Sequence, residues 1–129
     1  MPAFIAGAVL GWGLFAAPPA AEPAAPALEV RRSTVCTAIS DRRPLWSGHE
    51  FKASVQTVYY WLDVRAGNLP ASIRVLWFYE GKQASEIVLG VRHSKSRIWC
   101  HKRIRPGRWR VEARSPAGEL LSFAEFRIS

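Results

Sequence analysis

Alternation of apolar and charged side chains along short segments is the feature that most limits what this chain can fold into. In the segment RWRVEAR, residues 108–114, Trp109, Val111 and Ala113 alternate with four charged residues. A period of two residues places the two sets on opposite faces of a β-strand. The segment therefore predicts a strand with one buried face and one solvated face.

Similar patterns recur from Val30 onward. SIRVLWFYEGK has apolar or aromatic side chains at alternate positions and then a turn at residues 80–82, while VQTVYYWLDV is apolar on both faces, as in a central strand. SRIWCHKRI places Ile98, Cys100 and Ile104 opposite its basic residues. These segments predict further strands of the same sheet system.

Turn-forming residues separate the segments, for example at Pro106–Gly107 and at residues 116–118. The last segment, ELLSFAEFRIS, slips out of phase between Phe123 and Ala124, which predicts a β-bulge there. About seven short strands in roughly a hundred residues predict an all-β fold, an antiparallel immunoglobulin-like β-sandwich formed by residues 30–129.

The first thirty of the 129 residues differ in composition from the rest. Residues 1–17 are almost entirely apolar, which is typical of a secretory signal and shorter than the roughly 20 residues of a membrane-spanning helix. Residues 18–29 are rich in Pro and Ala, as in an extended linker. We therefore expect a signal-like or weakly anchoring segment, a linker and a β-sandwich, in a periplasmic or other extracytoplasmic protein that is tethered to the membrane if the first segment is retained.

The net charge of +8 is concentrated in one stretch of the chain. Eight Lys or Arg residues and no acidic residue lie between Arg92 and Arg110, and the remainder is neutral. Such a field of one sign attracts polyanions. If the two strands that flank RIRPGR form a hairpin, one continuous face gathers Arg97, Trp99, His101, Arg103, Arg108 and Arg110. The alternative is a solvated strand pair whose arginine stems cover the tryptophans without any ligand.

Two functions would use this face. The first is an exported or membrane-tethered binding module that docks an anionic partner, such as an acidic protein, a cell-wall polymer or a lipid headgroup surface. The second is a cytosolic nucleic-acid-binding β domain, which we favour less because no recognition motif is visible. Acidic residues are scattered along the chain, so we predict no enzymatic activity and no cofactor.

Cys36 and Cys100 are the only cysteines. In an oxidising compartment they would form a disulfide worth ~4 kcal/mol in the chain-entropy model, and two buried free thiols are the alternative. Cys100 and His101 are adjacent, but neighbours on a strand point to opposite faces. The sequence has no other pair of Cys or His residues at the short spacing that is typical of zinc ligands, so we predict no metal site.

Several blocks follow one another in a recognisable order, namely TAISDRRPLW, TVYYWLDVRAGN, IRVLWFYEGK, RIWCHKRI and GRWRVEARSPAGELLSFAEFRI. Their order and spacing, over roughly residues 32–128, resemble those of the Domain of Unknown Function 2914 family. The resemblance implies a bacterial protein of a family that is often attached to membrane-anchoring or linker segments. It implies an immunoglobulin-like β-sandwich and supplies no activity.

Overall fold

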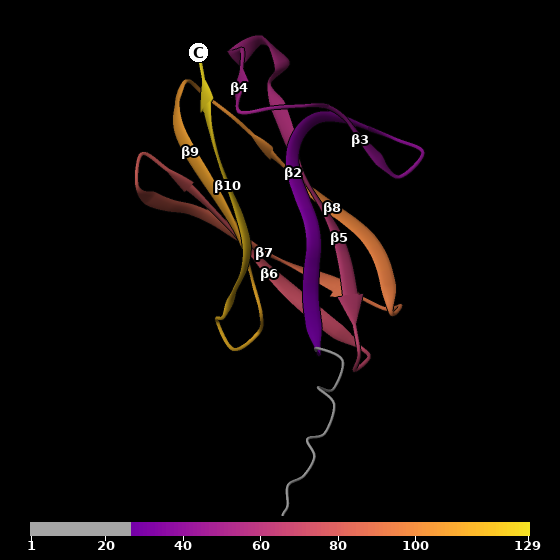
Figure 1. The fold of residues 1–129 in the computed structure, drawn as a ribbon. Coiled ribbons are helices and arrows are strands. Elements are labelled where there is room, and N and C mark those ends of the chain that lie inside the picture. The colour runs from indigo at the N-terminus through magenta and orange to yellow at the C-terminus, as the bar shows by residue number, and fades with distance from the viewer. Residues whose placement is uncertain (1–26) are drawn as a thin grey trace, which may run out of the picture.

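The alternating segments pair into two sheets that enclose an apolar core (Figure 1). The computed structural model describes residues 27–129, and in this range the chain forms nine strands and one 3-10 helix. The predicted all-β sandwich is confirmed. The strand number exceeds the expected seven because two short strands, of five and two residues, carry no alternation long enough to recognise.

One sheet has four strands in the order β3-β2-β5-β8. Their bounds are β2 Leu28–Ser40, β3 Arg43–Ser47, β5 Thr57–Ala66 and β8 Lys95–Arg103. All pairs within this sheet are antiparallel. The central strand predicted from VQTVYYWLDV is β5, which pairs with β2 on one side and β8 on the other.

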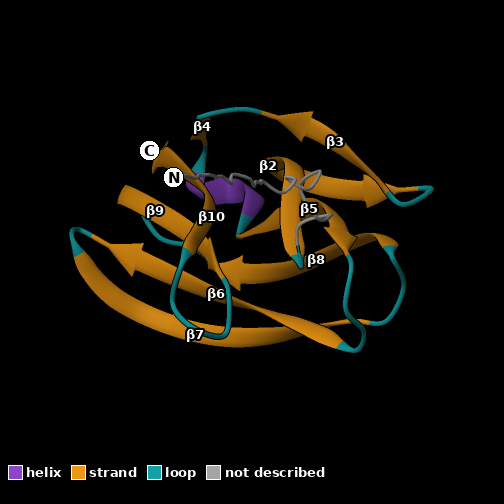
Figure 2. Cartoon of the chain, turned by 60° about the horizontal axis from the view of Figure 1, so that its bottom comes forward, coloured by secondary structure: helices purple, strands orange, loops and turns teal. Residues whose placement is uncertain are grey.

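The second sheet has five strands in the order β4-β10-β9-β6-β7. Their bounds are β4 Glu50–Phe51, β6 Ala71–Tyr79, β7 Lys82–Val91, β9 Gly107–Arg114 and β10 Leu120–Ile128, and the helix η2 spans Ala53–Val55. The short β4 pairs with β10 in parallel, whereas the other pairs are antiparallel. Figure 2 shows the edge strands β3 and β7 at opposite extremes of the sandwich.

The alternation in β9 is confirmed, since Trp109, Val111 and Ala113 are all buried. In β10 the phase does slip, but the position predicted for the bulge was wrong. The register shift lies between Leu120 and Ser122, ahead of the expected position. The apolar residue Leu121 packs against the core at the bulge, so the change of face precedes the phase slip that is visible in the sequence.

The expected hairpin between β8 and β9 does not exist. β8 pairs only with β5, in the four-stranded sheet, and β9 pairs with β10 and β6 in the other sheet. The turn at Pro106–Gly107 belongs to a connection that crosses from one sheet to the other (Figure 1). Alternation fixes which face of a strand is buried, but it does not identify the strand's partner, and this is why the sequence was misleading.

Large aromatic side chains fill the space between the sheets. Trp77 makes edge contacts with Tyr60 and with Phe126, at ring-centroid distances of 6.3 and 6.4 Å, and Trp109 stacks on Phe126 at 6.1 Å. Aromatic pairs at these separations add to the stabilisation that burial already provides. The core therefore holds both sheets rigidly and leaves their outer faces as the surfaces on which a partner can dock.

The predicted signal-like segment and most of the linker, residues 1–26, lie outside the described residues. The first strand begins at Leu28, two residues before the expected start of the folded unit at Val30. Within residues 27–129, no helix has the length and apolar character needed to cross a membrane.

Candidate functional site

Four of the six side chains predicted to form a basic face do lie on one surface. Arg97, Trp99, His101 and Arg103 occupy alternate positions of β8, and their cross-strand partners on β5 are Asp63, Trp61, Tyr59 and Thr57. The residues between them on β8, Ile98 and Cys100, belong to the core side. The four residues therefore form a row on the outer face of the four-stranded sheet, which we call the β8 row.

Aromatic rings lie between the cations of this row. The rings of His101 and Tyr59 are 6.0 Å apart, and Trp99 is half-buried opposite Trp61. Arg32 lies over the ring of Trp61 at 5.6 Å. Cations and aromatic faces thus share this surface, as in sites that bind an anionic group next to a flat ring.

The cations of β8 have no acidic partners among the residues that the structure describes. Lys95, Arg97, Lys102 and Arg103 are absent from every ion pair within 4.0 Å in residues 27–129. Asp63 faces Arg97 in the register, yet its carboxylate pairs with Arg65. The positive charge of β8 is therefore uncompensated in the folded protein.

Arg108 and Arg110 lie instead on the outer face of the five-stranded sheet, away from the β8 row. The prediction that they complete one continuous face was wrong. Every arginine of β9 is also neutralised: Arg108 pairs with Glu80, Arg110 with Glu112 and Glu125, and Arg114 with Glu112. These acids come from other strands and turns, or from beyond the basic stretch, so counting charge along the sequence overstated the charge of this region.

Two glutamates of this second face, Glu112 and Glu80, are held ionised. Burial alone would raise the pKa of Glu112, but hydrogen bonds from Arg110 and Arg114, at 2.7 and 2.8 Å, outweigh it and lower that pKa. A hydrogen bond from the backbone N–H of Arg108 likewise lowers the pKa of Glu80. Carboxylates with lowered pKa values are poor proton donors near neutral pH, which argues against their use as general acids.

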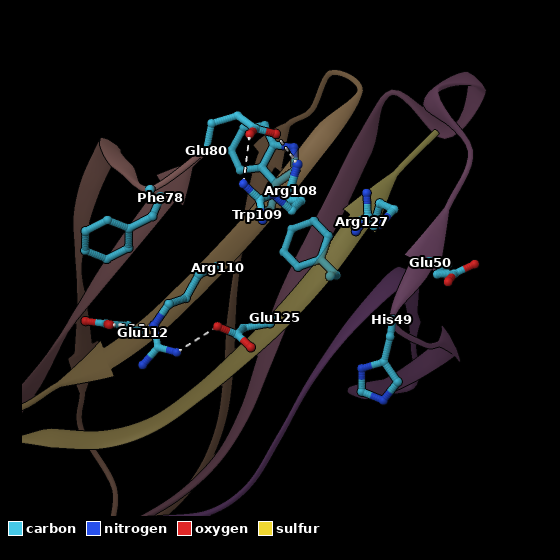
Figure 3. Close-up of a pocket in the computed structure, with 12 residues that line it drawn as sticks. His49, Glu50, Phe78, Glu80, Arg108, Trp109, Arg110, Glu112, Glu125 and Arg127 are labelled. Atoms are coloured by element: carbon cyan, nitrogen blue, oxygen red, sulfur yellow. Dashed lines mark hydrogen bonds and ion pairs between the residues drawn. The ribbon is translucent and has the colours of Figure 1, made fainter.

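A broad cavity of about 640 Å³ lies on this face, at the junction of β4, β6, β9 and β10 (Figure 3). Figure 3 shows the Arg110–Glu125 and Arg108–Glu80 contacts inside it, with the aromatic ring of Phe78 on one wall. Its charged groups are of both signs and largely satisfy one another. It is therefore the larger cavity but the weaker candidate for binding an anion.

A smaller cavity of about 280 Å³ lies at one end of the β8 row. Its lining contains four cationic residues and one carboxylate, and we call it the basic pocket: Arg42, Asp63, Arg65, Lys95, Ser96 and Arg97. Arg65 and Lys95 face each other directly across β5 and β8. Like charges in that position repel each other, and the carboxylate of Asp63 offsets this repulsion on the side of Arg65.

Arg42 reaches this pocket because of the turn between β2 and β3. Asp41 and Arg42 form a two-residue loop with φ values of 54° and 61°, the left-handed conformation of a type I′ hairpin. For a residue that carries a Cβ, this left-handed conformation costs about 1 to 2 kcal/mol. The indole N–H of Trp61, which is 3% exposed, donates a hydrogen bond of 3.0 Å to the carbonyl oxygen of Arg42 and fastens the turn to the sheet.

The structure contains two free thiols rather than a disulfide. Cys36 pairs with Tyr59 of β5 and Cys100 pairs with Tyr60, so β5 lies between the two cysteines. Tyr59 and Tyr60 point to opposite faces of the sheet, as do the cysteines opposite them. Of the two alternatives left open by the sequence, the geometry is that of two buried thiols, and burial raises the pKa of Cys100 to about 12.

Within the described part of the chain, no three His, Cys, Asp or Glu side chains come together as a metal site would require. The residues that sequence reasoning missed are Arg42, Arg65 and Lys95. The signal of the first two was weak, because DRRP reads simply as a turn and Arg65 directly follows VQTVYYWLDV, which reads as a buried strand. The alternation of Asp63 and Arg65 with Leu62 and Val64 could have placed the first two on the outer face.

Fold and site together define a small β-sandwich domain in which the arginines of β9 are ion-paired and the cations of β8 are not, within residues 27–129. Residues 70–128, which contain β6 to β10, match the family model described as "Protein of unknown function (DUF2914)". This match confirms the family resemblance, over a shorter range than the blocks quoted from about residue 32. The family segment includes the whole β8 row but neither Arg42 nor Arg65.

Two further comparisons complete the picture. No curated protein matches the chain. Among solved structures, a crystal structure of selenomethionine-labelled β-glucosidase from Kluyveromyces marxianus is similar with a TM-score of 0.46 and 10% identity, covering 79% of this chain and 14% of that one. The chain thus spans a small part of that protein's length.

Proposed function

We propose that this chain is a binding module that docks an extended polyanion on the outer face of β8 and β5. The observation that carries the proposal is the contrast between two strands: the arginines of β9 are all ion-paired, whereas the cations of β8 have no acidic partner in residues 27–129. An uncompensated row of cations attracts a polyanion and is costly to maintain without one.

The arrangement of the row supports a linear partner. Alternate strand residues are about 6.6 Å apart, so the row from Arg97 to Arg103 extends about 20 Å, with Trp99 and His101 between its cationic ends. A polymer whose anionic groups alternate with ring faces would contact the cations and the aromatic side chains in turn. We infer an acidic polymer of the cell envelope, with the domain held outside the cytoplasm by the apolar residues 1–17.

The test compares the full chain with two variants of equal charge change. R97E/R103E reverses the ends of the β8 row, and R108E/R127E reverses two arginines on the other sheet. Affinity for polyglutamate and for a sulfated polysaccharide, measured at physiological salt, should fall at least about tenfold in the first variant and by less than about twofold in the second. Equal losses in both variants would show that only net charge matters.

The same titrations include single-stranded DNA of matched charge. Preference for base-free polymers agrees with an envelope partner, whereas clear preference for DNA would replace this proposal with a nucleic-acid-binding function. Cell fractionation tests the location separately: recovery of the chain wholly in the cytoplasm would contradict the extracytoplasmic part of the proposal.

A further inference from the structure

We propose that the basic pocket binds one phosphate group, as inorganic phosphate or as a phosphomonoester on the docked polymer, and that Trp61 positions Arg42 for this contact. The inference rests on the proposed docking function and names the chemistry of its anchor point. The pocket shares Arg97 with the β8 row but differs from it in shape, since the pocket is a bounded cavity of about 280 Å³ and the row is an open surface.

The charges of the pocket favour a compact dianion. Asp63 is occupied by Arg65, and the remaining cations, Arg42, Lys95 and Arg97, make no ion pair among residues 27–129. A single carboxylate ligand carries one negative charge, while a phosphate monoester carries nearly two at neutral pH and offers three acceptor oxygens. Guanidinium groups match those oxygens in geometry as well as charge.

The walls of the pocket come from three separate parts of the chain. Arg65 and Asp63 lie on β5, Lys95 and Arg97 lie on β8, and Arg42 comes from the β2–β3 turn. The strand residues are fixed by the ladder between β5 and β8. Arg42 lies in the turn beyond the last pair of the β2–β3 ladder, Ser40 and Arg43, and its carbonyl oxygen accepts the hydrogen bond from Trp61 that joins the turn to β5.

The conformation of Arg42 agrees with this assignment. Its φ of 61° is one that glycine or asparagine adopts more readily, so the turn retains an arginine at an unfavourable position. Strained residues that the surrounding structure holds in place cluster at ligand sites. The strain here coincides with the one cation of the pocket that lies outside the β5–β8 ladder.

The experiment is a titration of the full-length chain with inorganic phosphate at constant ionic strength, followed by nuclear magnetic resonance of the backbone amides. We expect saturable shifts at Lys95, Ser96 and Arg97, and none at the neutralised β9 face. R42Q should weaken binding about tenfold, which is the loss expected for one charge-assisted hydrogen bond. R127Q, which removes an exposed arginine of the other sheet, should leave it unchanged.

Two further variants test the roles of particular side chains. D63N removes the only carboxylate of the pocket and should tighten phosphate binding several-fold, a direction that general damage to the fold would not produce. W61F keeps an aromatic ring, though a smaller one, and removes the N–H donor. It should weaken phosphate binding as much as R42Q does, with no additional loss in R42Q/W61F, while binding of polyglutamate to the β8 row persists.

Each result decides between the two proposals. If the wild-type chain binds polyglutamate but not phosphate, this inference is overturned and the docking function stands. Absence of both would overturn both. Shifts spread over all surface arginines, or a D63N variant with unchanged affinity, would place phosphate elsewhere and refute the pocket. Competition between inorganic phosphate and a polymer that bears phosphomonoester groups, but not polyglutamate, identifies a phosphate borne by the polymer. Saturable binding of inorganic phosphate without that competition identifies free phosphate as the ligand.

Discussion

Replacement of Glu112 by glutamine offers a direct measure of what holds the outer face of the five-stranded sheet together. The side chain of Glu112 is only 9% exposed, and its two oxygens each accept one hydrogen bond, from Nε of Arg110 at 2.7 Å and from Nε of Arg114 at 2.8 Å. A glutamine has one oxygen and one NH₂ group. One arginine therefore faces another donor, and the other loses the charge that strengthened its bond.

The expected cost follows from these contacts. A hydrogen bond to a charged group contributes about 1.5 to 3 kcal/mol. The substitution removes one such bond and weakens the other, and we take a value in the lower half of the range for a single bond because both arginines remain about one-third exposed to water, where screening is strong. We therefore expect E112Q to lower the free energy of unfolding by about 2 kcal/mol. For a domain of this size that corresponds to a fall in Tm of about 8 to 16 °C.

The pH dependence gives an independent check. Because the pKa of Glu112 in the folded protein lies below its ordinary value of 4.5, its contribution to stability is present above that value and is lost as the pH falls through the folded pKa. Thermal unfolding followed by circular dichroism should show a large difference in Tm between wild type and E112Q at neutral pH. The gap should narrow progressively below pH 4.5, where the wild-type side chain also becomes neutral.

The matched control is E125Q. Glu125 contacts the same Arg110 at 3.1 Å but is 67% exposed, so its loss should change the Tm very little. Equal effects of E112Q and E125Q would refute the argument that burial makes the first contact valuable. A difference in Tm between E112Q and wild type that stays constant from neutral to acid pH would show that the charge of Glu112 is not the cause of the destabilisation.

Three further predictions concern packing and the thiols. Cys36 and Cys100 should resist a thiol reagent in the folded protein and both react after unfolding without reductant, because burial raises the pKa of each; recovery of a disulfide-linked peptide would contradict this. Gly107→Ala should destabilise the domain by about 1 to 3 kcal/mol in urea unfolding, because φ is +141° and an added Cβ would lie 2.6 Å from the ring of Tyr79. The control Gly90→Ala, where no atom lies within 4 Å of the added Cβ, should change stability little. Equal effects of the two substitutions would argue against the clash. Trp77→Ala should cost about 3 to 5 kcal/mol by the same assay, and a loss below 1 kcal/mol would mean that this ring does not join the two sheets.

The sequence predicted the strands well because burial on a strand is a local property. Trp109, Val111 and Ala113 repeat at a period of two, and the structure buries all three. Partnership between strands is not local. β8 and β9 have the same alternation whichever sheet they join, and the Pro106–Gly107 turn is compatible with a hairpin or with a crossing between sheets, so nothing in the stretch itself distinguishes the two.

The candidate site was predicted only in part for a related physical reason. Charge neutralisation operates through space, and the partners of the β9 arginines lie 28 residues away in the case of Arg108 and Glu80, and 15 residues away for Arg110 and Glu125. A count of charge along the chain assigns excess to both strands equally. Only the folded arrangement separates the compensated arginines of β9 from the uncompensated cations of β8.

The β2–β3 hairpin links stability to the proposed docking surface. Trp61 points to the outer face of its sheet, where an indole would normally be exposed, yet it is 3% exposed and donates its N–H to the turn at Arg42. Burial of that ring stabilises the hairpin in its folded-back position, and the same position brings the guanidinium of Arg42 to the basic pocket. The burial of Trp61 therefore fixes the position of Arg42 in the basic pocket. An anion that binds Arg42 should in turn protect the Trp61 N–H from hydrogen exchange, because by linkage a ligand that binds only the closed hairpin must stabilise it.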